Sequence, residues 1–119
     1  MGIGSTNAPL KAFGYLGVPL AAWADDEVAR LKDRTVQLAR CRGLFVLGTW
    51  VDRANASVRA RPQWEELVKQ AILARPCLVV VLSGELLSAQ PAVRAGMVAK
   101  LAQLEVGYLS LHDDVRVPA

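Results

Sequence analysis

The stretch Leu78–Leu82, which reads LVVVL, decides the fold of this chain. Three consecutive valines between two leucines are typical of a parallel strand that is covered on both faces, because such a strand has no polar side. Arg75-Pro76 before it ends a helix, since the residue before a proline disfavours helical geometry. Ser83-Gly84-Glu85 after it indicates a turn. The sequence thus predicts a buried central strand.

Two helices are predicted upstream of this strand. In the first, Asp25 or Asp26 can cap the start, since a carboxylate suits the cap position, and Gly43 ends the helix. The second begins at Pro62, which fits the first position of a helix, and stops at Arg75. Apolar residues at helical spacing form the expected inner faces. They are Val28, Leu31, Thr35 and Leu38 in the first helix, and Trp64, Leu67, Val68, Ala71 and Ile72 in the second.

The remaining elements complete an alternating order. Strands are predicted at Ala12–Val18, Leu44–Val51 and Val106–Leu111, and a third helix at Pro91–Leu104. The order β-α-β-α-β-α-β favours a mostly parallel sheet with helices on both faces. We therefore expect one α/β domain, a three-layer α/β/α core over residues 11–112. A flexible lead at residues 1–10 and a tail at residues 113–119 flank it.

The first two strands carry different signals. Gly14 and Gly17 either weaken the first strand or let another group approach its backbone closely. Leu44–Val51 is an apolar run, which is typical of a strand covered on both faces.

Composition limits the functions that fit. The chain has 119 residues, a formal charge of +3, one histidine and two cysteines. His112 alone does not make a zinc or iron cluster, and we expect Cys41 and Cys77 to be buried free thiols. No export signal is evident, and no apolar run is long enough to cross a membrane. We therefore expect a cytoplasmic protein without a metal, a cofactor or a membrane partner.

Short motifs between about residues 11 and 112 resemble one known family. Lys11–Pro19 reads KAFGYLGVP and includes the pair Gly14-Tyr15, Arg61-Pro62 is followed by Leu67, and Val106–Leu111 reads VGYLSL. These resemble the first-strand, helix-start and fourth-strand motifs of serine recombinase catalytic domains of the resolvase/invertase type. The resemblance implies a four-stranded sheet with the strand order 2-1-3-4.

The same resemblance indicates that the family's reaction is missing. The family ends its first strand in Y-x-R-V-S, whose serine attacks DNA phosphate, whereas Gly17 and Pro19 stand at the arginine and serine positions. Val28 stands at a family glutamine, and Ser83–Ala89 lacks the arginines of the family's D-R-L-x-R motif. Only Arg61 remains at a position that the resemblance assigns to phosphate binding. We predict no enzymatic activity, because losing even one charge-stabilising donor costs about 10²–10³ in rate.

The third predicted helix suggests what the chain does instead. Its polar interruptions are few, and a helix that is apolar most of the way round favours burial on more than one side. Its small residues form a stripe that would admit another helix: Ala92, Gly96 and Ala99. Two interpretations stay open, because the stripe either contacts a second copy or another protein, or packs on its own sheet.

These observations favour a catalytically inactive, resolvase-like module for protein contacts that self-associates as a homodimer. The alternative is weak binding of nucleic acid, since seven of the ten arginines lie between Arg30 and Arg61. The candidate contacts are Arg53, Arg59 and Arg61. Charge runs also simply solubilise a surface, which is the third interpretation of these arginines. An active site-specific DNA recombinase fits the sequence least.

The crevice between the ends of strands one and three is a further candidate site, since doubly wound sheets bind ligands there. Polar and aromatic residues are expected at its rim: Trp23, Asp25, Ser83 and Glu85. A small-molecule site and an empty remnant of an ancestral cleft both stay open. Ser83 and Ser88 are expected as turn or capping serines rather than as replacement nucleophiles.

Overall fold

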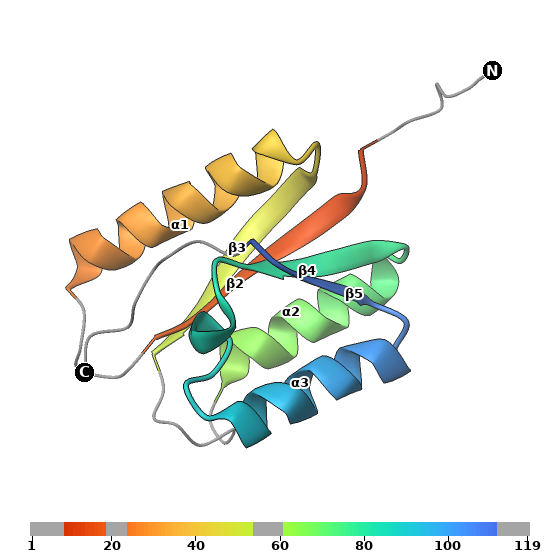
Figure 1. Cartoon of the computed structure of the whole chain (residues 1–119). Coiled ribbons are helices and arrows are strands. Elements are labelled where there is room, and N and C mark those ends of the chain that lie inside the picture. The colour runs from red at the N-terminus through yellow and green to blue at the C-terminus, as the bar shows by residue number, and fades with distance from the viewer. Residues whose placement is uncertain (1–8, 19–23, 54–60, 112–119) are drawn as a thin grey trace.

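A parallel sheet of four strands lies at the centre of the structure, a computed structural model in which residues 9–18, 24–53 and 61–111 are described. The strands are β2 (Lys11–Val18), β3 (Phe45–Arg53), β4 (Cys77–Val81) and β5 (Gly107–Ser110). They lie in the order β3-β2-β4-β5, which confirms the predicted order 2-1-3-4 (Figure 1). The three valines of β4 are fully buried, as their pattern predicted.

The neighbours of β2 accompany it over different lengths. With β3 it pairs from Lys11 and Phe45 to Val18 and Arg53, whereas its pairing with β4 ends at Gly14 and Val80. The sheet therefore opens between the carboxyl half of β2 and β4. A single 3₁₀ turn, η1 (Gly84–Leu86), contacts β2.

One face of the sheet is covered by α1 (Asp25–Cys41) (Figure 1). Of its predicted inner face, Val28 and Thr35 are buried and Leu31 and Leu38 are partly buried, and Ala39, which was not predicted, is buried as well. Gly14 lets this helix approach, since the nearest carbon of Thr35 would lie only 3.3 Å from a Cβ at Gly14. Gly43 ends the helix with a φ of 77°, a conformation that favours glycine.

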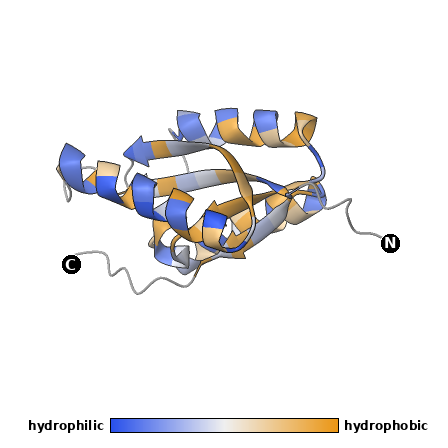
Figure 2. Cartoon of the chain, turned by 90° about the horizontal axis from the view of Figure 1, so that it is seen from above, coloured by the Kyte–Doolittle hydropathy of each residue, from blue (hydrophilic) through white to orange (hydrophobic). Residues whose placement is uncertain are grey.

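The opposite face carries α2 (Pro62–Leu73) and α3 (Pro91–Gln103) (Figure 1). From α2, Trp64, Leu67 and Ala71 are buried, and the ring of Trp64 meets Tyr15 edge-on at 4.9 Å between centroids. Met97 and Leu101 are the buried residues of α3. Figure 2 shows hydrophilic and hydrophobic residues alternating along the helices, as expected of amphipathic helices.

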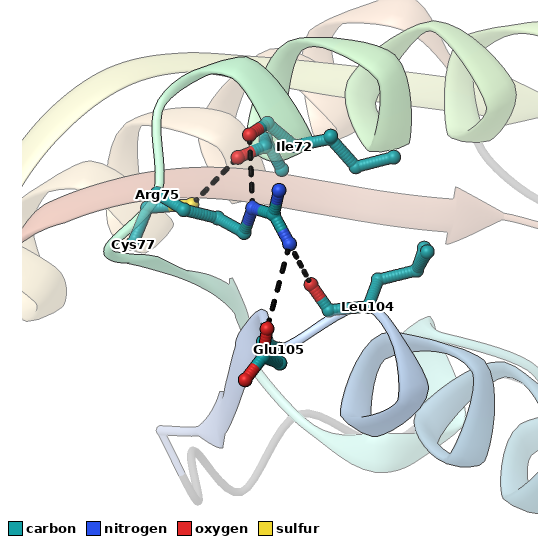
Figure 3. A network of polar contacts seen from close by, with 6 residues as sticks. Ile72, Arg75, Cys77, Leu104 and Glu105 are labelled. Carbon is teal, nitrogen blue, oxygen red and sulfur yellow. Dashed lines mark hydrogen bonds and ion pairs between the residues drawn. The ribbon is translucent and has the colours of Figure 1, made fainter.

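Arg75 joins the carboxyl ends of α2 and α3 (Figure 3). Its Nε donates to the carbonyl oxygen of Ile72 at 3.0 Å, and its Nη1 donates to that of Leu104 at 2.9 Å. The carboxylate of Glu105 lies 3.8 Å from the same Nη1. Because the last carbonyls of a helix are negative and lack partners, one cation here stabilises two helix ends together.

Two predictions about α1 are wrong. Ala24 holds the cap position in place of Asp25 or Asp26, and no side chain caps the first turn, since Asp26 accepts only the N–H of Glu27, at 3.0 Å. Cys41 is exposed because it falls on the outer side of the last turn, and only Cys77 is a buried thiol.

The prediction for the second strand is wrong in its burial. β3 forms an edge of the sheet, so only one of its sides is covered by a neighbouring strand, and Phe45 is 54% exposed. The carbonyl of Leu10, which the sequence assigned to the lead, accepts the N–H of Phe45 at 2.9 Å. The predicted lead and tail otherwise fall almost entirely outside the described residues.

Candidate functional site

Three polar side chains meet where β2 and β3 end. The hydroxyl of Tyr15 donates to Oδ2 of Asp52 at 2.9 Å, and Nη1 of Arg61 donates to the Tyr15 oxygen at 3.1 Å. The same Nη1 donates to the carbonyl oxygen of Leu87 at 2.7 Å. Tyr15 is 0% exposed, and Asp52 and Arg61 are each 4% exposed. These three side chains, called the strand-end network below, are closed off from solvent.

Asp52 also fixes the start of α2. Its Oδ1 accepts the backbone N–H of Gln63 at 3.0 Å, and its Oδ2 accepts that of Trp64 at 2.8 Å. A carboxylate at this place satisfies N–H groups that have no partner within the helix and favours the positive end of the helix dipole. The network therefore ties together two strands and one helix.

Gly17 provides the space that Arg61 occupies. A Cβ at position 17 would lie 2.8 Å from Arg61 Nη1 and 2.9 Å from the carbonyl oxygen of Leu87. Both distances are too short for non-bonded atoms. In the sequence analysis, Gly17 marks a lost family position and Arg61 a retained one. The structure shows that the place of the Arg61 guanidinium depends on the missing side chain at Gly17.

Burial of Tyr15 raises the pKa of its hydroxyl well above the ordinary value of 10.0. The nearby Arg61 lowers this pKa and Asp52 raises it, and burial is the largest of these effects. Tyr15 therefore remains a proton donor to Asp52 at neutral pH.

Apolar residues fill the surroundings of the network. Val28 is 7% exposed and packs with Leu16 and Val18 rather than facing an open site. Leu86 and Leu87 are fully buried, the first in the core beneath α1 and the second in the core that contains Tyr15. They lie beside the half of β2 that has no pairing with β4, where the crevice was predicted.

The two serines near this segment differ. Ser88 Oγ accepts the N–H of Gln90 at 3.2 Å, just before α3, which confirms the prediction of a turn or capping serine. Ser83 Oγ is buried and has no hydrogen-bond partner among the described residues. Glu85 is exposed, and Pro19 and Trp23 lie outside the described residues.

The cationic candidates do not gather on one open surface. Arg53 pairs with the exposed Asp25 at 2.6 Å, Arg61 is buried, and Arg59 lies outside the described residues. Arg61 would reach a phosphate only if its guanidinium left Tyr15 and Leu87. The exposed arginines of the predicted basic region are instead found on α1 and just after it: Arg30, Arg34, Arg40 and Arg42.

The small-residue stripe of α3 faces away from the sheet. Ala92, Gly96 and Ala99 are exposed, and a Cβ at Gly96 would meet no described atom within 4 Å. The prediction that the stripe packs on its own sheet is therefore wrong. Beside it, between α2 and α3, lies a hollow of about 470 Å³ lined by Trp64, Ala92, Val93, Gly96, Met97 and Lys100.

Sequence reasoning missed two features. The role of Asp52 was missed because it lies 11 and 12 positions before Gln63 and Trp64, whose N–H groups it accepts, and a capping signal is read from residues directly before the helix. The exposed side chains of Phe45 and Leu47 were missed because an apolar run does not distinguish an edge strand from a central one.

The described residues contain no group of three histidine, cysteine, aspartate or glutamate side chains that could hold a metal ion. Within the same residues, every helix is too short or too polar to cross a membrane.

Solved structures of serine recombinase catalytic domains share this fold. The C-terminal catalytic domain of ISC1926 TnpA, an IS607-like serine recombinase, matches with a TM-score of 0.73 and 15% identity, over 90% of this chain and 71% of that one. The N-terminal catalytic domain of TP901-1 integrase matches with a TM-score of 0.71 and 20% identity, over 88% and 79% of the two chains. By sequence, neither a family model nor a curated protein matches. The resolvase-type fold that the motifs predicted is confirmed.

Proposed function

We propose that this chain is a serine-recombinase-like domain that does not cleave DNA and acts through protein contacts, including contact between two copies. The observation that carries the proposal is the packing of Arg61 over Gly17, with 2.8 Å between Nη1 and the place of a Cβ. The resemblance assigns an arginine to position 17 and a phosphate contact to Arg61. Here position 17 has no side chain, and the guanidinium of Arg61 lies in the space that an arginine side chain at position 17 would begin to fill.

The chemistry of phosphoryl transfer supports the same conclusion. Its transition state spreads negative charge over several oxygens, and cationic side chains aimed at those oxygens lower the barrier. Leu86 and Leu87, both fully buried, stand in the segment where the resemblance expects arginines. Leucine side chains at these positions offer no stabilisation to such a charge.

The test of inactivity is a search for protein linked to DNA. The purified chain is incubated with supercoiled plasmid and with single-stranded DNA, denatured in detergent and separated on a gel. We expect no DNA to migrate with the denatured protein. A covalent adduct would contradict the proposal, and its loss in an Arg61→Gln variant would identify the arginine as part of an active site.

A second candidate function is DNA binding through α1, favoured by the exposure of Arg30, Arg34 and Arg40 along that helix. Asp33 lies among them, so the surface is mixed in charge. Binding of this kind weakens steeply as salt rises, because phosphate contacts release counterions. Fluorescence-anisotropy titrations compare the DNA affinity of two variants: Arg30→Gln/Arg40→Gln on α1, and Lys69→Gln/Lys100→Gln on the other face as a control. Binding through α1 predicts a loss of affinity in the first variant alone, whereas non-specific attraction predicts equal losses in both.

A further inference from the structure

The large exposed apolar side chains of the described residues lie at the amino-terminal edge of the sheet and at the end of α2, where Leu47 and Leu73 line one hollow. They belong to the amino ends of β2 and β3 and to the last residue of α2, and together they are called the edge patch: Leu10, Phe45, Leu47 and Leu73, at 42%, 54%, 44% and 82% exposure. Isolated exposed leucines are common, but a cluster of them marks a contact surface. We infer that a second copy of this chain docks on the edge patch, an inference that rests on the proposed self-association.

The patch carries both projections and a hollow. Leu73 projects most, and next to it lies a hollow of about 460 Å³ whose lining includes Phe13, Leu47 and Trp50 together with Leu73 itself. In a two-fold contact the same surface appears on both copies, so it has to supply the projecting groups and the space that receives them. The edge patch supplies both.

Charge favours a copy over a partner of opposite charge. The run Phe45–Val51 contains no charged residue, and on the α2 side of the hollow the polar lining residues are Glu66 and Gln70. A strongly charged partner would find only one charge, that of Glu66, among the residues that line the hollow. A surface that is mostly apolar fits best against another mostly apolar surface, and a second copy supplies one.

The backbone of β3 adds to this fit. Within the described residues, no strand pairs with its outer edge, so this nine-residue strand can take another strand beside it. Its bulge, where Ala12 pairs with Val46 and Phe13 with Gly48, leaves Leu47 without a partner in β2. The opposite edge, β5, has only four residues. Pairing β3 of one copy with β3 of another therefore gives a dimer and leaves no β3 edge for a third copy. Pairing β3 with β5 of another copy is disfavoured because β5 is too short to form many backbone hydrogen bonds.

The α3 stripe is the competing surface for self-association, and a matched pair of substitutions separates the two. Leu73→Arg and Ala99→Arg each place the same charge at an exposed helix position, and neither residue contributes to the buried core. Sedimentation velocity over a wide range of protein concentrations measures the dissociation constant of the dimer for each variant. Thermal unfolding followed by circular dichroism verifies that both variants fold.

We expect the wild-type chain to dimerise, Leu73→Arg to raise the dissociation constant at least about tenfold, and Ala99→Arg to leave it unchanged. Amide hydrogen exchange in β3 should slow as the protein concentration increases. A dimer weakened by Ala99→Arg and not by Leu73→Arg would overturn this inference alone. A chain that stays monomeric, including one whose β3 edge binds an extended segment of another protein, would overturn it together with the proposed self-association.

Discussion

The strand-end network and the edge patch lie at different ends of the sheet and contrast in character. At the carboxyl ends of the strands, Tyr15, Asp52 and Arg61 are polar side chains that are buried and bonded to one another. At the amino end of β3, Phe45 and Leu47 are apolar side chains that remain exposed. An enzyme domain commonly shows the reverse, with reactive polar groups in an open cleft and apolar groups covered.

This contrast separates side chains that interact within the molecule from side chains that are left uncovered at its surface. The buried polar groups bond to one another and to the backbone of Gln63, Trp64 and Leu87, so they stabilise and position the fold, although Nε of Arg61 has no partner among the described residues. Apolar groups left in water gain free energy only when something covers them. The strand ends thus serve the stability of the molecule, while the edge patch is available to a partner. The predictions below test each half of this comparison.

The largest effect is expected from Asp52→Ala. The substitution leaves the buried Tyr15 hydroxyl without its acceptor, uncaps α2 and removes a negative charge from the surroundings of buried Arg61. We expect the free energy of unfolding, measured by urea denaturation, to fall by about 3–5 kcal/mol. Asp25→Ala is the control, because Asp25 pairs with Arg53 on the exposed surface and should change stability little. Equal losses in the two variants would show that the network is not a stabilising unit.

The next effect separates two glycines. Gly17→Ala places a Cβ 2.9 Å from the backbone oxygen of Leu87, which cannot move without shifting the chain, and should cost about 1–3 kcal/mol of unfolding free energy. Gly96→Ala meets no described atom and should stabilise α3 by about 0.5–1 kcal/mol. Calorimetric melting curves should show a lower melting temperature than wild type for Gly17→Ala and a higher one for Gly96→Ala. A neutral Gly17→Ala would contradict the close packing of Arg61 at this site.

Much of the fold was predictable because each helix and strand carries a local signal. The valines of Leu78–Leu82, the proline starts at Pro62 and Pro91 and the helix end at Gly43 all fall where the structure has them. Hydrophobic periodicity and the residues that start or stop a helix are local features, so they can be read from a single sequence.

The site was less predictable because its contacts are long-range. Tyr15 lies 37 positions from Asp52 and 46 from Arg61, and nothing near Gly17 in sequence reveals that an arginine packs against it. The exposure of Phe45 likewise depends on β3 being at an edge, and this is a property of strand order rather than of the strand. Such features emerge only when distant segments are placed together.

A smaller effect concerns pH. The pKa of Tyr15 is raised by burial, so the folded state keeps its proton while the unfolded state begins to ionise near pH 10.0. The stabilising contribution is therefore complete below pH 10.0 and declines above it, by up to about 1.4 kcal/mol per pH unit. Tyr108 and Cys77, whose pKa values burial also raises, add to the same decline. Urea denaturation at several alkaline pH values should show a shallower decline for Tyr15→Phe than for wild type, and parallel curves would contradict the burial of the hydroxyl.

The smallest effect on stability is expected at the edge patch. Leu73 is 82% exposed, so Leu73→Gln removes almost no buried area from the monomer and should change its unfolding free energy by less than about 0.5 kcal/mol. Leu67→Ala in the same helix is the contrast, because Leu67 is fully buried and its truncation should cost about 2–5 kcal/mol. Both are measured by urea denaturation at low protein concentration, so that association between copies does not contribute. If replacing Leu73 leaves the stability of the monomer unchanged but weakens association, the side chain contributes free energy only at the contact with a partner. If Leu73→Gln instead destabilised the monomer strongly, the patch would belong to the core of the fold, and the contrast between the two ends of the sheet would disappear.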